Sequence, residues 1–118
     1  MEDYIIDYEN FRDTFKKTET TGEEIGEVIM RMAGYYARYN VRMGEALRVF
    51  SAKKAEFQNQ IDPSSNKAMT SSKVEVLADA TPEAYTYEMS RIHVNNIQEY
   101  INSLKALQRG AMNEYSNY

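Results

Sequence analysis

The chain has 118 residues, with a formal net charge of −4, no cysteine, one histidine and 42% hydrophobic residues. This composition predicts a single domain over residues 1–118 with a modest core, and it excludes disulfides and thiolate chemistry. A membrane span is excluded by the mean hydropathy of −0.67 and by the lack of any apolar run near the roughly 20 residues that a bilayer needs. The acidic N-terminus resembles no targeting peptide, so we expect a cytoplasmic protein.

Residues 1–20 predict a short N-terminal helix. Four aromatic residues recur there at spacings of four, three and four, which places them on one helical face: Tyr4, Tyr8, Phe11 and Phe15. A threonine-rich tract then interrupts the pattern. Thr21 and Glu24, three residues later, form a capping box that predicts the start of a second helix.

Residues 22–61 predict one long amphipathic helix. Its apolar residues recur with a seven-residue period, which is the seam of a helix packed against other helices. At 1.5 Å per residue this helix reaches roughly 60 Å, whereas a compact domain of this size has a diameter of about 30 Å. The seam therefore predicts a homo-oligomer, with an interface made of Ile25, Ile29, Met32, Tyr36, Tyr39, Met43, Phe50 and Phe57.

A proline, two serines and an asparagine after Asp62 predict the end of this helix and a polar loop over residues 62–71. A short helix, capped by Ser71 or Ser72, begins the segment 72–110. No part of this region predicts a convincing strand.

A return helix completes that segment. Thr81 provides a hydroxyl cap and Pro82 suits the first helical position. Gly110 is a natural C-terminal cap, and residues 111–118 predict a frayed tail. The expected fold is all-α, a long helical hairpin with a short N-terminal helix.

The residues that carry chemistry are scarce. The five glycines form no phosphate-binding loop, and His93 is the only histidine. Glu88 lies five residues before it, so the Glu-x-x-His spacing of carboxylate-bridged metal bundles is absent. We therefore expect no enzyme, no catalytic residue, no metal site and no cofactor.

Charge is unevenly distributed. Residues 31–54 carry six basic residues and one acid, Glu45, which gives +5 within a chain of −4. Arg31, Arg38, Arg42 and Lys53 project along one stripe of the helix, beside the apolar seam. Two interpretations stay open for this stripe, a solvated face paired with neighbouring glutamates and a surface that binds a polyanion.

Lys54 and the tyrosines also bear on the choice between these two interpretations. Lys54 projects into the seam between Phe50 and Phe57, so we expect the seam to open there to a partner, a pore or an anion. Ten tyrosines could stack on unpaired bases, but those at seam spacing, Tyr36 among them, favour packing in a core or interface.

Residues 45–54 read E-A-L-R-V-F-S-A-K-K, late in the predicted long helix, and residues 72–80 follow the loop. These two segments, in this order, resemble the UvsY-like family of phage recombination mediators, in which the first segment has the form E-x-L-R-aliphatic-x-small-x-K-K. Asp62 falls where the family has an aspartate at the helix end, and residues 72–80 resemble a segment ending in V-L-S-A-D. The resemblance covers roughly residues 35–110.

This resemblance implies a ring-shaped homo-oligomer that binds single-stranded DNA and helps a RecA-like recombinase to displace the single-strand binding protein. It would act in the host cell cytoplasm if phage-encoded. The family's basic positions after Lys53 and Lys54 are Gln58 and Gln60 here, which supply hydrogen bonds but no charge. The candidate DNA-binding residues are Arg38, Arg42, Arg48, Lys53, Lys54, Gln58, Gln60, Lys67 and Lys73.

A second hypothesis belongs to another functional class. A helical adaptor, or a phage structural or inhibitory protein, would bind a protein partner and not nucleic acid. Its acidic N-terminal helix would then be the contact surface.

Overall fold

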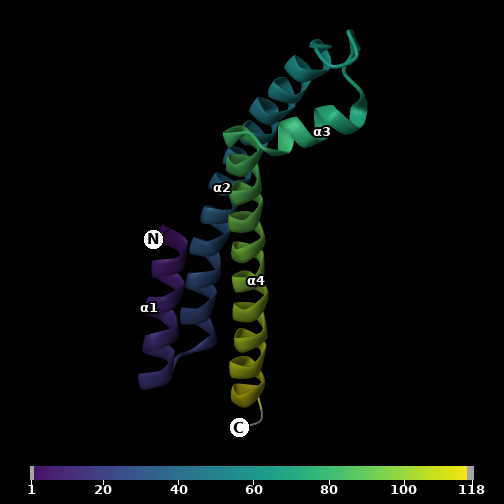
Figure 1. The fold of residues 1–118 in the computed structure, drawn as a ribbon. Coiled ribbons are helices and arrows are strands. Elements are labelled where there is room, and N and C mark those ends of the chain that lie inside the picture. The colour runs from purple at the N-terminus through teal and green to yellow at the C-terminus, as the bar shows by residue number, and fades with distance from the viewer. Residues whose placement is uncertain (1, 117–118) are drawn as a thin grey trace. The chain divides into compact units, whose positions relative to one another are not determined.

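The computed structural model describes residues 2–116, with side chains over residues 2–112. Four helices account for most of the described chain, and the prediction of a predominantly helical protein is confirmed (Figure 1). A minimal two-stranded sheet lies between the second and third helices. The elements are α1 (Asp3–Lys17), α2 (Gly22–Gln58), β1 (Ile61–Asp62), β2 (Lys67–Ala68), α3 (Ser71–Asp79) and α4 (Pro82–Ser116).

The chain divides into two compact units, and α2 and α4 contribute to both. We call residues 1–38 and 94–118 the terminal unit, of which 2–38 and 94–116 are described, and residues 39–93 the central unit. The expectation of one folding domain stays a prediction, because two compact units can belong to one domain.

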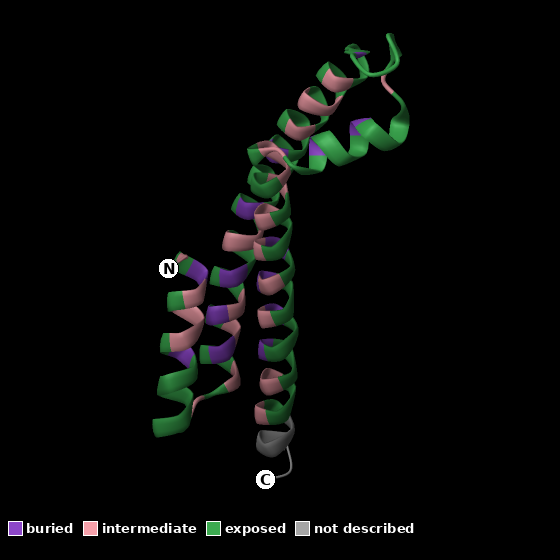
Figure 2. Ribbon diagram, in the orientation of Figure 1, coloured by how far each residue is buried: buried purple, intermediate pink, exposed green. Residues whose placement is uncertain are grey.

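The terminal unit is a packed three-helix arrangement of α1, the first part of α2 and the last part of α4. Buried residues recur on all three helices (Figure 2). The rings of Tyr8 and Tyr100 stack with centroids 3.9 Å apart. The side-chain amide of Gln108 donates to the carbonyl of Gly22 over 3.0 Å. The buried apolar residues are Tyr4, Phe11, Ile25, Val28, Met32, Val94, Ile97, Ile101 and Leu104.

The central unit contains the second part of α2, the strand pair, α3 and the first part of α4. Its buried apolar residues are Tyr39, Ala46, Val74 and Ala78. The rings of Phe50 and Tyr87 stack with centroids 6.0 Å apart. Much of the remaining apolar surface of this unit is exposed to solvent.

The helix starts follow the predicted capping chemistry, with one change. Thr21 Oγ1 accepts from the backbone N–H of Glu24 over 3.1 Å, and Thr81 Oγ1 accepts from the N–H of Ala84 over 3.2 Å. The cap of α3 is Thr70, which accepts from the N–H of Lys73, and neither of the predicted serines caps it. The short helix accordingly begins at Ser71, one residue before the predicted start.

The loop prediction for residues 62–71 missed a small hairpin. The long helix ends at Gln58, three residues early, and β1 pairs antiparallel with β2 in the register Ile61↔Ala68. Asn66 closes the turn at a φ of 58°, a left-handed conformation that asparagine tolerates. Its N–H donates to the carbonyl of Asp62 over 2.8 Å. Strands of only two residues show no alternation of apolar and polar residues, so the sequence pattern could not reveal them.

The predicted end of the last helix at Gly110 is wrong, because α4 continues to Ser116. A glycine within a helix costs only about 1 kcal/mol, which packing can outweigh. Ala111 is half-buried, and a Cβ on Gly22 would lie 3.1 Å from Cγ of Met112. These contacts favour helix over residues 111–116, where we expected a frayed tail. Residues 117–118 of that tail lie outside the described part of the chain.

The predicted oligomer seam is covered in part by the chain itself. Ile25, Met32 and Tyr39 are no more than 4% exposed in a single copy. A second copy cannot reach these three side chains in this fold, because α4 is nearly as long as α2 and supplies a packing partner within the chain. Five residues of the seam remain half-buried and stay predicted as interface: Ile29, Tyr36, Met43, Phe50 and Phe57.

Candidate nucleic-acid interface

Two of the predicted DNA-binding arginines stack on tyrosines. The guanidinium carbon of Arg38 lies 5.0 Å from the ring centroid of Tyr35, and that of Arg42 lies 4.7 Å from Tyr39. Each tyrosine is three residues earlier on α2, so helical geometry brings the pair together. A guanidinium that lies over a ring keeps the N–H groups at its own edges available, where they can donate to an incoming phosphate.

Arg48 and Lys53 form ion pairs with acids three residues away. Arg48 Nη2 lies 2.5 Å from Glu45 Oε1, and Lys53 Nζ lies 3.2 Å from Glu56 Oε2. The hydrogen bonds from Arg48 lower the pKa of Glu45 below its usual value. Both pairs are exposed, so their Coulomb attraction is screened by solvent and they hold the cations only weakly.

Four further candidates have no charged partner among the described side chains. Lys54 is half-buried, as are Phe50 and Phe57 on either side of it, so the seam is open to solvent at this point. Lys67 is exposed on β2. Gln58 and Gln60 are exposed, and the backbone carbonyl of Gln60 accepts from the N–H of Met69 over 3.3 Å.

Lys73 has a structural role that the sequence prediction missed. Its ammonium donates to Asp62 and, over 3.0 Å, to Ser64 Oγ. Asp62 is only 5% exposed, and the hydrogen bonds from Lys73 and from the hydroxyl and backbone of Ser64 lower its pKa to about 2. Since Lys73 is held by a buried carboxylate, it joins the hairpin to α3 and is a poor candidate for DNA contact.

Arg31 is likewise removed from the predicted basic stripe. Its guanidinium donates two hydrogen bonds to Asp7 of α1, over 2.9 and 3.0 Å, and the hydroxyl of Tyr35 donates to the same carboxylate over 3.2 Å. The bonds to Asp7 raise the pKa of Arg31. This network fixes α1 to α2. The predicted stripe is also divided between the units, since Arg31 and Arg38 belong to the terminal unit, and Arg42 and Lys53 to the central unit.

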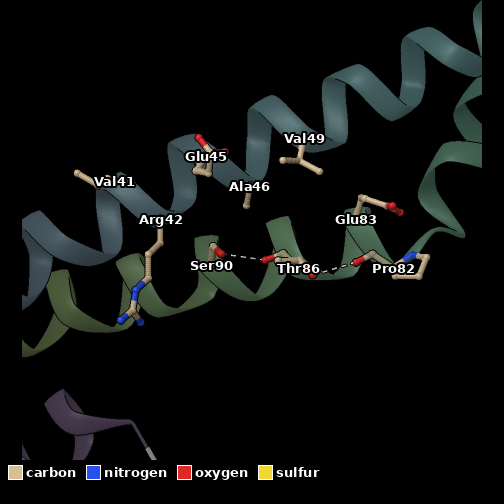
Figure 3. Close-up of a pocket in the computed structure, with 9 residues that line it drawn as sticks. All are labelled: Val41, Arg42, Glu45, Ala46, Val49, Pro82, Glu83, Thr86 and Ser90. Atoms are coloured by element: carbon tan, nitrogen blue, oxygen red, sulfur yellow. Dashed lines mark hydrogen bonds between the residues drawn. The ribbon is translucent and has the colours of Figure 1, made fainter.

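A groove that sequence reasoning missed lies in the central unit. It encloses about 680 Å³ between α2 and the first part of α4 (Figure 3). The hydroxyls of Thr86 and Ser90 donate to their own helix, over 3.0 and 2.9 Å, which leaves the walls mainly apolar. The lining residues are Val41, Arg42, Glu45, Ala46, Val49, Pro82, Glu83, Thr86 and Ser90. The sequence signal that could have revealed this groove is Val41 and Val49, two apolar residues of α2 that fall outside the seven-residue seam.

The described residues contain neither a metal-binding cluster nor a helix that could span a membrane. No group of three or more histidine, aspartate and glutamate side chains within them could hold a metal ion. Among their helices, none is both long enough and apolar enough to cross a membrane.

Comparison with protein-family models, curated proteins and solved structures finds no match to this chain. The likeness to phage recombination mediators therefore stays an expectation from two sequence segments.

Proposed function

We propose that this protein is a non-enzymatic, single-stranded-DNA-binding recombination mediator that works as a homo-oligomer. Its partners are single-stranded DNA, a RecA-like recombinase and a single-strand binding protein. The mediator role and the ring form rest on the resemblance of residues 45–54 and 72–80 to the mediator family. The DNA-binding part also has physical support in the contacts of the basic side chains.

The observation that carries the proposal is the difference between fixed and available cations. Arg31 and Lys73 are held by carboxylates of other elements, Asp7 and Asp62. By contrast, the basic residues of the second part of α2 have only exposed partners on their own helix, an aromatic ring or no charged partner among the described side chains. A phosphate can replace such weak partners at little cost.

Arg48, Lys53 and Lys54 are the core of the proposed phosphate contacts, with Arg38 and Lys67 as further candidates. Lys53 Nζ also lies 5.8 Å from the ring centroid of Phe57, beside half-buried aromatic surface on which a base could stack. Gln58 and Gln60 follow on the same segment as uncharged donors. Oligomerisation multiplies this group of cations, which lets a chain of net negative charge bind a polyanion locally.

A variant pair tests the site. Lys53→Ala with Lys54→Ala should lower the affinity for a labelled single-stranded oligonucleotide, measured by fluorescence anisotropy over a salt series. Because each neutralised phosphate of a single strand contributes about 0.7 to the slope of log K against log salt, the slope should fall by about 1.4. The matched control is Lys16→Ala with Lys17→Ala, which removes the same charge from exposed positions of α1.

Equal slopes for the two double variants would overturn the site assignment. No binding by the parent protein at low salt would overturn the function and favour the helical adaptor. The ring is tested by light scattering with and without oligonucleotide, which should give one defined multiple of the chain mass.

A further inference from the structure

The groove between α2 and α4 has apolar walls and two charged groups without matching partners. Val41 is 73% exposed and Val49 is 41% exposed along its α2 side. At one end, Oε2 of Glu83 is buried and accepts no hydrogen bond from the described residues. Arg42 lies at the other end (Figure 3). It makes no ion pair with any described side chain, and its guanidinium lies over the ring of Tyr39.

These groups define what an occupant must supply. A buried carboxylate oxygen without a donor is costly, so the occupant should bring a cation to Glu83, whose two oxygens exchange by rotation of the carboxylate. It should also bring a carboxylate to Arg42 and an apolar ridge to the valines. Among the described side chains of the groove walls, only Arg42 offers donors that are not already used, because the hydroxyls of Thr86 and Ser90 donate to their own helix.

The groove of a second copy would supply all three of these groups, namely a cation, a carboxylate and apolar side chains. We propose that a second copy of this chain docks here about a two-fold axis, with the two α2 segments antiparallel. The Arg42 of each copy then meets the second copy's Glu83, and Val41 and Val49 of each copy pack into the opposite groove. In a two-fold interface the same patch faces itself, so a surface with a cation at one end and an anion at the other is self-complementary.

Single-stranded DNA fits this groove poorly. Its walls are apolar, and its buried unpartnered group is a carboxylate, which repels phosphate. Arg42 therefore moves from the DNA-binding set to the contact between copies. The inference rests on the homo-oligomer part of the proposed function and names its contact. A two-fold contact closes at a dimer, so a larger assembly requires a second surface, for which Ile61 and Val76 of the same unit are exposed.

Val41→Asp tests the apolar part of this contact. Because the side chain is exposed in one copy, the substitution should leave helicity by circular dichroism unchanged. We expect it to weaken self-association by about tenfold or more, measured by sedimentation velocity over a concentration series. The matched control is Met30→Asp, another exposed apolar residue of α2, at 77% exposure and outside the groove, which should associate like the parent.

A charge exchange tests the pairing. Arg42→Glu and Glu83→Arg should each weaken association by about tenfold or more, and the double variant should recover most of it. A monomeric parent, an unchanged Val41→Asp variant, or a double variant no better than the singles would each overturn the inference. Anisotropy on the same samples separates this from the DNA proposal, which fails only if the parent shows no salt-dependent oligonucleotide binding.

Discussion

The terminal and central units differ in how well each covers its own apolar surface. Of the described residues, the terminal unit buries nine hydrophobic side chains and exposes four large ones, whereas the central unit buries four and exposes eight. Polar contacts follow the same division, since Asp7, Asn96 and Gln108 link different elements of the terminal unit. Most ion pairs of the central unit are exposed and local to one helix.

Charge separates the units as well. The central unit has seven basic and seven acidic residues, so the terminal unit carries the whole net charge of −4. The terminal unit is thus a well-packed bundle that carries net negative charge. The central unit combines exposed apolar side chains with weakly held cations, which is the combination that partners use. We therefore place the core of the phosphate contacts, Arg48, Lys53 and Lys54, and the contact between copies in the central unit.

The largest expected effect is loss of the terminal core. Leu104 is fully buried, so Leu104→Ala should lower the free energy of unfolding by about 2–5 kcal/mol, measured by urea titration of the helical signal. Leu77→Ala in the central unit, where the side chain is 41% exposed, should cost less than about 1 kcal/mol. Similar losses at the two positions would contradict the difference in packing between the units.

The sequence predicts what depends on neighbours along the chain. The seven-residue period located α2, and the hydroxyl of Thr81 followed by a proline located the start of α4. It could not predict partners from other elements. The spacing of Arg31 on its own helix is that of a surface stripe, and only the fold brings Asp7 beside it.

The same limit applies to the rest of the candidate site. Lys73 and Asp62 are eleven residues apart across a hairpin too short to leave a pattern, and the groove joins Val41 to Glu83, about forty residues later. Gly110 has the residue type of a helix end, yet packing beyond it favours the helix. Local signals predicted the elements, and tertiary packing decided which cations remain available.

The network of Asp7 is the next test of the terminal unit. Asp7→Asn removes the charge that Arg31 and Tyr35 share, and we expect a loss of about 1 kcal/mol in the free energy of unfolding. The value is at the low end for charged hydrogen bonds because the Arg31 side chain is 50% exposed and solvent screens the pair. Asp13→Asn on the same helix, at an exposed position, is the control and should leave urea titration unchanged.

The pH dependence of the central unit should depend on Asp62. Its pKa in the folded protein is about 2, below its usual 3.8, so the unfolded chain takes up the proton first as the pH falls. The stabilisation is complete above pH 3.8 and is lost as the pH falls to about 2. Asp62→Asn should lower the free energy of unfolding at neutral pH, and urea titrations at a series of pH values should show a smaller loss of stability between pH 3.8 and 2. Asp79→Asn, on the exposed end of α3, should lose stability over this pH range as the parent does.

The smallest expected effect concerns how loosely Arg48 is held. Glu45→Gln removes its carboxylate partner, and the thermal midpoint should not change measurably because both side chains are exposed. If phosphate competes with Glu45 for this guanidinium, the variant should bind single-stranded oligonucleotide more tightly, with a salt slope up to about 0.7 steeper. Glu88→Gln frees Arg91 from the same kind of pair on α4, away from the proposed contacts, and should leave the slope unchanged. An equal gain in both variants would mean that net charge alone, and not the cations of α2, attracts the strand.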